Sequence, residues 1–300
     1  MRKLKFIFSV IGICFLGTNN SFSQGCSDAG FCTINSFKPN SVDSTKILNN
    51  QFKAGSFFGQ GDKSISIYGI YLEYNRQLNK KFGLDAKLTT LAQNGNGIHV
   101  FDLSDIFVNA NYLAGKKLRL TFGTKIPLSN ANKTYENIPL PMDYQSSLGT
   151  FDLIFGIGYE IKKIQFVAAI QQPLTQNNNE FLSINSNLNA FQSTNKFERS
   201  GDVLIRASLP INLNSKIKLT PSLLPIYHLT NDKYTDEFNV QKEINNSQGI
   251  TLNGTVFVDY ELNSKSIIQL NLGMPFIVRE VRPDGLTRGF VANVEYRIKF

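Results

Sequence analysis

The sequence has no long apolar run beyond its first residues, and it is poor in the side chains that most enzymes and metal sites use. No segment after Leu16 approaches the roughly 18 to 20 consecutive apolar residues of a transmembrane helix. Only two histidines and three cysteines occur among its 300 residues. If the mature chain crosses a membrane without such a helix, it must cross as a β-barrel.

The two histidines give little support for catalysis. His99 falls in an expected external loop, and His228 has the parity of a residue facing the barrel lumen, the wrong side for attacking a lipid. No local motif offers either one an orienting partner for general-base chemistry. Gly156-Ile157-Gly158 does not read as a phosphate loop, because no helix start follows it. We therefore expect no enzymatic activity and no cofactor.

The first 23 residues have the pattern of a secretory signal peptide. Arg2, Lys3 and Lys5 precede an apolar run from Phe6 to Leu16, and small residues follow up to Ser23. This pattern predicts Sec-type export with cleavage near Ser23. Loss of the three basic residues reduces the formal charge of +8 to a mild excess, which gives no argument for a nucleic-acid partner of an exported protein.

The last segment of the chain, 289–300, alternates apolar and polar residues. Its apolar side chains are Phe290, Ala292, Val294, Tyr296, Ile298 and Phe300, and between them lie Asn293, Glu295, Arg297 and Lys299. A period of two is that of a β-strand. Charges opposite an apolar face that ends in an aromatic residue suit a strand with lipid on one side and water on the other.

Eleven earlier segments repeat this alternation, and each is long enough for a tilted membrane strand of about 9 to 11 residues. All twelve lie roughly at 51–60, 65–78, 82–93, 104–114, 118–130, 151–162, 164–176, 203–214, 217–230, 250–263, 265–280 and 289–300. A hydrophobic content of 42% is also compatible with a soluble all-β protein. Barrels share that composition because half of each strand is polar.

The connections between these segments alternate between short and long. Short turns are expected at 79–81, 115–117, 162–163, 215–216 and 263–265, and long polar loops at 131–150, 177–202, 231–249 and 281–288. Outer-membrane barrels have short periplasmic turns and longer external loops. Tyrosines near the expected strand ends fit an interfacial girdle: Tyr68, Tyr74, Tyr112, Tyr159, Tyr260 and Tyr296. We predict an all-β, transmembrane, antiparallel up-and-down β-barrel of about 12 strands.

The signal peptide, the alternating segments, the short lysine-containing turns and the terminal aromatic together resemble a Gram-negative outer-membrane β-barrel. The resemblance covers about 51–300. It implies that Tyr296, Ile298 and Phe300 form the C-terminal signal read by the barrel-assembly machinery, and that the mature protein contacts lipid of the bacterial outer membrane. The expected organisation is a signal peptide at 1–23, a periplasmic or plug segment at 24–50 and the barrel at 51–300.

A weaker similarity rests on prolines that precede apolar residues late in the segments, namely Pro127, Pro173, Pro210, Pro225 and Pro275. This is similar to the FadL-like and phenol-degradation-associated outer-membrane transporter families, in which kinked strands accompany uptake of hydrophobic solutes. Prolines near strand ends also mark bulges and limit pairing. Both interpretations stay open from the sequence.

The segment 24–50 does not follow the strand pattern and contains Cys26 and Cys32. An isolated pair in an exported chain favours a disulfide. The alternatives are metal binding and lipidation of Cys26. Two cysteines are too few ligands for a closed zinc site. The segment could span about 90 Å if extended, so it can reach into the lumen. The resemblance to FadL-like barrels implies a partial plug.

Parity places a set of charged residues on the lumen side. The candidates are Glu73, Asp85, Lys87, Arg119, Lys125, Asp152, Arg206, Lys218, Asp259, Arg279, Glu295 and Arg297. Both signs occur, so the wall could be neutralised by ion pairs or could act as a charge-selective filter. Twelve strands lie between the filled barrels of about eight strands and the open channels of 16 to 18. We expect a channel that passively admits an unidentified small solute through a narrow lumen. The alternative is a non-transporting barrel whose external loops bind a partner or serve a structural role.

Overall fold

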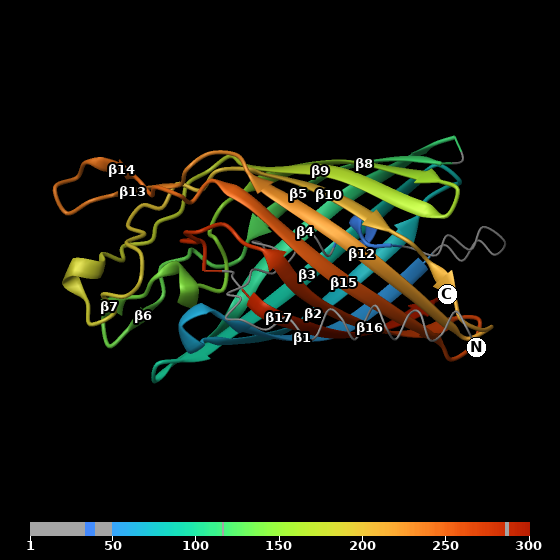
Figure 1. Ribbon diagram of the computed structural model, residues 1–300, viewed down its shortest axis with the longest axis horizontal. Helices are drawn as coiled ribbons and strands as arrows, with labels where there is room; N and C mark the ends of the chain where they lie inside the picture. The colour runs from blue at the N-terminus through green and yellow to red at the C-terminus, as the bar shows by residue number, and fades with distance from the viewer. Residues whose placement is uncertain (1–33, 40–49, 116, 286–287) are drawn as a thin grey trace.

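The computed structural model describes residues 34–39, 50–115, 117–285 and 288–300. Twelve long strands form one closed antiparallel barrel (Figure 1), so the predicted fold class is confirmed. They are β1 (Asn50–Gly61), β2 (Ser66–Gln77), β3 (Phe82–Gly95), β4 (Ile98–Ala114), β5 (Leu118–Pro127), β8 (Asp152–Ile161), β9 (Ile164–Pro173), β10 (Asp202–Ser208), β12 (Ile217–His228), β15 (Gly249–Glu261), β16 (Ser266–Ile277) and β17 (Arg288–Lys299).

The remaining elements are short. They are η2 (Asn35–Phe37), η3 (Asp62–Ser64), β6 (Thr134–Tyr135), β7 (Ile138–Pro139), η4 (Met142–Tyr144), η5 (Ser183–Asn185), β11 (Ile211–Asn212), β13 (Lys233–Thr235) and β14 (Gln241–Glu243). None of the described helices is long and apolar enough to cross a membrane.

Closure of the barrel depends on the first and last strands. β1 pairs with β2 on one side and with β17 on the other, from Gln51 opposite Lys299 to Gly61 opposite Arg288. Asn50 and Phe300 exchange two further backbone hydrogen bonds, with N···O distances of 3.1 and 3.0 Å. The sheet therefore has no free edge at the chain ends. This is the condition that a β-structure must meet in lipid, where no water can satisfy an open edge.

The side chains are arranged in the opposite sense to those of a soluble domain. On β17, Asn293, Glu295 and Arg297 are buried inside the barrel, while Val294 and Tyr296 point outward and are 50% and 40% exposed. The same order recurs on β2, where Glu73 is buried and its neighbours Leu72 and Tyr74 are exposed. Soluble proteins rarely expose contiguous apolar patches above a few hundred Å². The continuous apolar outer surface is that of a membrane-spanning barrel.

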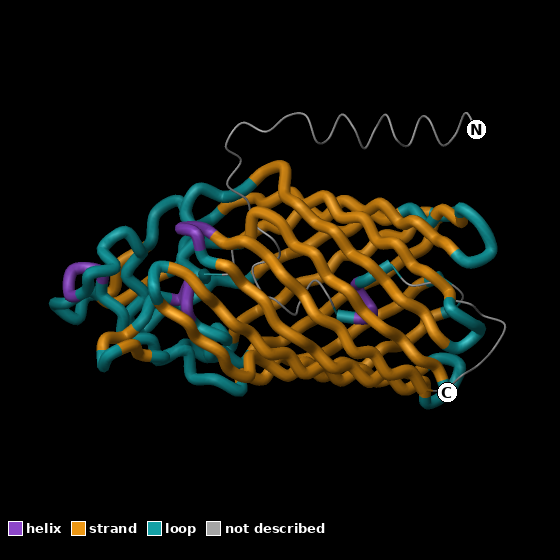
Figure 2. Tube along the Cα trace, turned by 90° about the horizontal axis from the view of Figure 1, so that it is seen from below, coloured by secondary structure: helices purple, strands orange, loops and turns teal. Residues whose placement is uncertain are grey.

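The two ends of the barrel differ, as the sequence predicted. The turns β2–β3, β4–β5, β8–β9, β11–β12 and β15–β16 are short and lie at the end that holds Phe300. At the opposite end the long connections β5–β8, β9–β10, β12–β15 and β16–β17 extend away from the strands (Figures 1 and 2). We call this the loop end.

Two strand boundaries differ from the prediction. β3 and β4 extend to Gly95 and Ile98 and meet in a two-residue turn, so the expected external loop around His99 is wrong. Asn96 and Gly97 both have positive φ, 52° and 76°, which is the geometry of a tight hairpin turn. The expected strand 203–214 breaks after Ser208, because Pro210 has no N–H for the ladder.

A charge introduced on the outer surface should destabilise the barrel in a depth-dependent way. Ile157 lies in the middle of β8 and Ile161 at its short-turn end, and both point outward, 41% and 49% exposed. Ile157→Arg should lower the free energy of unfolding by about 2–4 kcal/mol, and Ile161→Arg by about 0–1 kcal/mol. Urea unfolding in lipid vesicles measures both. Equal costs would show that β8 does not cross the hydrocarbon region.

Candidate functional site: the barrel lumen

Eleven of the twelve charged residues predicted for the lumen lie on strands of the barrel. Ten of the twelve are buried, and Arg119 and Lys218 are half-buried. The residue that does not lie on a strand is Arg279, which was expected on one. It lies beyond the end of β16 at Ile277, in the loop that leads to β17.

One side of the lumen, the charged wall, carries paired ions. The wall consists of Lys53, Glu73, Asp259, Glu295 and Arg297, on β1, β2, β15 and β17. Lys53 Nζ lies 3.0 Å from Glu73 Oε1, Arg297 contacts Glu295, and Arg297 Nη1 lies 3.7 Å from Asp259 Oδ1. Buried ions need such partners, because an uncompensated charge is costly away from water. This geometry favours a mutually neutralised wall.

Further ion pairs involve residues outside the charged wall, one of them with the wall residue Asp259. Lys125 Nζ lies 2.9 Å from Asp152 Oδ2 on the neighbouring strand, and Lys218 Nζ lies 3.2 Å from Asp259 Oδ2. Asp85 accepts hydrogen bonds from Asn75 and Asn111, at 2.7 and 2.5 Å. Lys53 was missed by the sequence analysis, because the three glycines around β1 weaken its pattern.

The opposite side of the lumen is apolar, and the sequence analysis did not predict it. This apolar wall consists of Phe107, Ile154, Val167, Ala169, Leu204, Leu224 and Ile226, on β4, β8, β9, β10 and β12. Their side chains point into the lumen and are buried there. Ile154 lies between Leu153 and Phe155, which point outward. The parity of Asp152 places Ile154 on the inner face, but parity does not show that the inward apolar residues of five strands gather on one side.

Residues 34–39, which we call the lumen segment, lie between the two walls. Both Figure 1, where the segment is blue, and Figure 2, where η2 is purple, place it within the barrel. Ile34 and Phe37 pack in the apolar cluster of the wall. On the other side, Lys38 Nζ lies 2.8 Å from Glu295 Oε2, and Lys53 Nζ donates to Asn35 Oδ1 at 2.6 Å. Cys26 and Cys32 lie outside the described residues.

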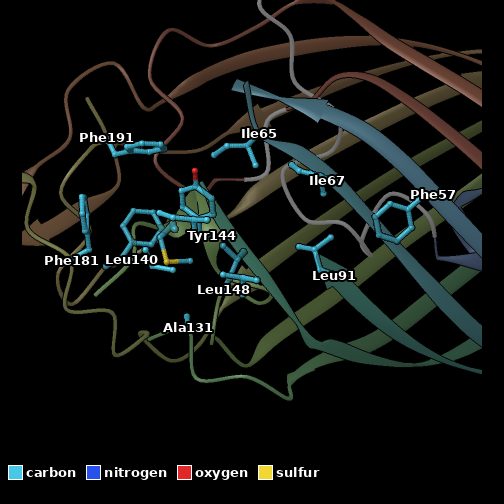
Figure 3. Packing of buried hydrophobic residues seen from close by; sticks show 14 of the residues in the cluster. Phe57, Ile65, Ile67, Leu91, Ala131, Leu140, Tyr144, Leu148, Phe181 and Phe191 are labelled. Atoms are coloured by element: carbon cyan, nitrogen blue, oxygen red, sulfur yellow. The ribbon is translucent and has the colours of Figure 1, made fainter. Parts of the chain in front are cut away.

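The loop end of the lumen is covered by a second apolar cluster, the outer cap (Figure 3). Its loop residues include Ala131, Leu140, Met142, Tyr144, Leu148, Phe181, Phe191 and Phe197, which pack on strand residues such as Phe57, Ile67 and Leu91. Tyr144 is fully buried, and its hydroxyl donates to Gly95 O at 2.9 Å. Burial raises the pKa of the Tyr144 phenol, so it stays a neutral donor.

A buried polar cluster, the rim network, fastens three of the long loops to the barrel. It consists of Arg199, Asp202, His228, Asp232, Arg279 and Asp284, all at most 4% exposed. His228 Nδ1 lies 2.7 Å from Asp202 Oδ1, and its Nε2 lies 2.8 Å from Asp232 Oδ1. Both ring nitrogens therefore contact carboxylates, and neither is left to accept a proton from a substrate.

The two arginines complete the rim network. Arg199 contacts Asp202, and its Nε lies 3.6 Å from Asp284 Oδ2. Arg279 Nη2 lies 2.5 Å from the same Asp284 oxygen, and Arg279 Nη1 lies 3.7 Å from Asp232 Oδ2. Burial lowers the pKa of Arg199, but the carboxylates of Asp202, Asp284 and Asp232 outweigh it and hold the pKa above its ordinary value.

Sequence reasoning missed this network because its members are far apart in the chain. The local signals are three short spacings, Arg199 to Asp202, His228 to Asp232 and Arg279 to Asp284, and nothing in the sequence connects one pair with another. Within the described part of the chain, no group of three or more His, Cys, Asp or Glu side chains is arranged to hold a metal ion. The contacts of the rim network connect residues of three loops with β10 and β12, which is the arrangement of a structural fastening.

Comparison with known proteins finds similar solved structures but no match to a family model or a curated sequence. Neither a scan against protein-family models nor a search of curated protein sequences gave a match. Among solved structures, the toluene transporter TodX of Pseudomonas putida is 12% identical, with a TM-score of 0.46, over 93% of this chain and 96% of that chain. The translocator domain of the autotransporter NalP from Neisseria meningitidis is 10% identical, with a TM-score of 0.48, over 85% and 90%.

LpxR from Salmonella typhimurium is 8% identical, with a TM-score of 0.48, over 83% of this chain and all of that chain. The chain is thus similar to outer-membrane β-barrels, as the sequence predicted. At these identities the similarity concerns the fold alone and gives no function.

Removal of the His228 ring should release the loops that the rim network holds. His228→Leu leaves the buried Asp202 and Asp232 carboxylates without their shared donor, which costs about 3–5 kcal/mol. Arg199 is 4% exposed in the intact protein. In vesicles that contain the variant, we expect trypsin to cleave after Arg199. Mass spectrometry identifies the cut. His99→Leu, at the exposed second histidine, is the control, and equal protection of Arg199 in both variants would contradict the fastening role.

Proposed function

We propose that this protein is an outer-membrane channel that passively admits a small solute through a narrow lumen. The observation that carries the proposal is the interior itself, where the polar and charged residues of the barrel are buried while the outer surface is apolar. A barrel that only anchored its loops in the membrane would need no such concentration of buried charge, because burying ions costs free energy.

The proposal includes export and assembly by the bacterial outer-membrane route. The expected signal peptide at 1–23, with cleavage near Ser23, would deliver the chain to the periplasm. The outward-facing Tyr296 and Phe300, 40% and 54% exposed, are available to an assembly factor before closure. With Ile298 they form the C-terminal signal that we propose for the barrel-assembly machinery.

Passage through the lumen is restricted at two levels. The outer cap covers the loop end, and the lumen segment lies deeper, between the walls. We propose that 24–50 acts as a partial plug. Its described part contacts the wall through Lys38 with Glu295, Asn35 with Lys53, and the carbonyl oxygen of Phe37 with Arg206. The barrel ladder does not include residues 34–39, so the segment can leave the lumen while the barrel stays closed.

A second candidate function is binding of a partner by the external loops. The β13–β14 hairpin extends beyond the barrel (Figure 1), and Phe238 near its tip is 78% exposed. Ile184, in the β9–β10 loop, is 71% exposed. Exposed apolar side chains outside the lipid are candidates for protein contacts. In this case the barrel would serve as the anchor.

Deletion of 24–49, which ends before β1, tests the channel and its plug together. We expect a larger single-channel conductance in planar bilayers and faster liposome swelling with sugars, amino acids and aromatic acids, because residues 34–39 no longer occupy the lumen. The matched control removes Glu237–Asn239 from the β13–β14 hairpin, outside the lumen, and should leave both readings unchanged. Unchanged conductance after the deletion would exclude the plug. No permeation of any solute in any variant would favour the anchor.

A further inference from the structure

A recess in the apolar wall has the shape of an aromatic ring. At its base lie Gly156 and Ala169, directly opposite each other on β8 and β9. The ring of Phe37 fills the recess so closely that a Cβ added to Gly156 would lie 2.3 Å from Phe37 Cε1. Larger apolar residues, Ile154 and Val167 among them, border the recess. A side chain at 156 would close it, so glycine there preserves a space for a flat apolar group.

Arg206, on the strand next to this recess, is a buried cation without an acidic partner. It is 3% exposed, and no described carboxylate lies within ion-pair distance of it. Its Nη1 donates to the backbone oxygen of Phe37 at 2.6 Å, its Nε has no hydrogen-bond partner, and its guanidinium carbon lies 5.8 Å from the ring centroid of Phe257. The guanidinium therefore has donors left unsatisfied.

This arrangement contrasts with other cations of the lumen. Lys53, Lys125 and Arg297 each contact a carboxylate of the barrel wall. A buried, unpaired guanidinium costs free energy, and a protein retains it most readily where an anion arrives from outside. The partner that Arg206 has in this structure, a carbonyl oxygen, is a neutral substitute for that anion.

We infer that the recess at Gly156 and the guanidinium of Arg206 form a binding site for an aromatic monocarboxylate, and that the ring and carbonyl oxygen of Phe37 occupy this site in the closed channel. This rests on the proposed function, for which it names the substrate class. The ring of the solute takes the place of the Phe37 ring, and its carboxylate takes the place of the carbonyl oxygen. A carboxylate matches the planar fork of a guanidinium better than a neutral oxygen does.

The charge at the site selects a monoanion. Arg206 supplies a single unpaired positive charge, and the nearest wall is apolar. A dianion would keep an uncompensated charge in this environment, and a neutral aromatic compound would leave the guanidinium unpaired. Solute binding and release of residues 34–39 are then coupled, because both compete for one recess.

The test uses 3-phenylpropanoate, which carries a ring and a carboxylate on a short chain, and its neutral amide, 3-phenylpropanamide, as the matched ligand. Titration calorimetry on the purified full chain in detergent measures both. Phe37→Ala should bind the carboxylate about tenfold more tightly than the unaltered protein does, because the tethered ring no longer competes. In the Phe37→Ala protein the carboxylate should bind about tenfold more tightly than the amide.

Two further variants in the Phe37→Ala background locate the site. Arg206→Gln should weaken carboxylate binding about tenfold and leave amide binding unchanged. Gly156→Val should weaken binding of both ligands by filling the recess. Equal affinity of Phe37→Ala for acid and amide would overturn the inference without relying on the folding of the Arg206 variant, and so would unchanged binding after Gly156→Val.

The outcomes separate this inference from the proposed function. Liposome swelling with an uncharged sugar is measured on the same proteins. Sugar permeation without Arg206-dependent binding would leave a channel with another solute and refute the aromatic carboxylate. Arg206-dependent binding without permeation of any solute would support the site and refute the channel.

Discussion

The pairing of β1 with β17 is the constraint on which the rest of the structure depends. Lipid offers no hydrogen-bond partner to a strand edge, so the sheet is stable in a membrane only when its first and last strands meet. Here they meet over the whole length of β1, and the exchange between Asn50 and Phe300 continues the ladder to the terminal residue. Closure then fixes which side chains face the lipid and which face the interior, because neighbours along a strand alternate.

Closure also forces charges into an enclosed interior, where they have to be neutralised. The pairs Lys53–Glu73 and Lys125–Asp152 lie between adjacent strands, so the register of the barrel determines their geometry. At the loop end the same requirement binds the loops, since Arg199 and Arg279 share Asp284. Electrostatic neutralisation therefore stabilises both the wall of the barrel and the loops that the rim network holds.

The sequence could predict what depends on local periodicity. The strand count, the alternation of turn lengths and the inward direction of residues such as Glu73 and Glu295 all follow from a period of two and were found in the structure. The apolar wall could not be predicted, because parity places Ile154 on the inner face with Asp152 but does not show which strands lie side by side around the closed barrel. The rim network could not be predicted either, because His228 and Asp284 are brought together only by closure and by the folding of three loops.

The lumen segment shows how a few residues can match an interior with two different walls. η2 is a 3-10 helix, in which residues three apart lie on the same side. Ile34 and Phe37 consequently face the apolar wall, while Asn35 and Lys38 face the charged wall. Each side of the segment thus contacts groups of its own kind, and its departure would uncover an apolar surface on one side and the Glu295 carboxylate on the other. The two walls thus complement a segment that is itself apolar on one side and polar or charged on the other.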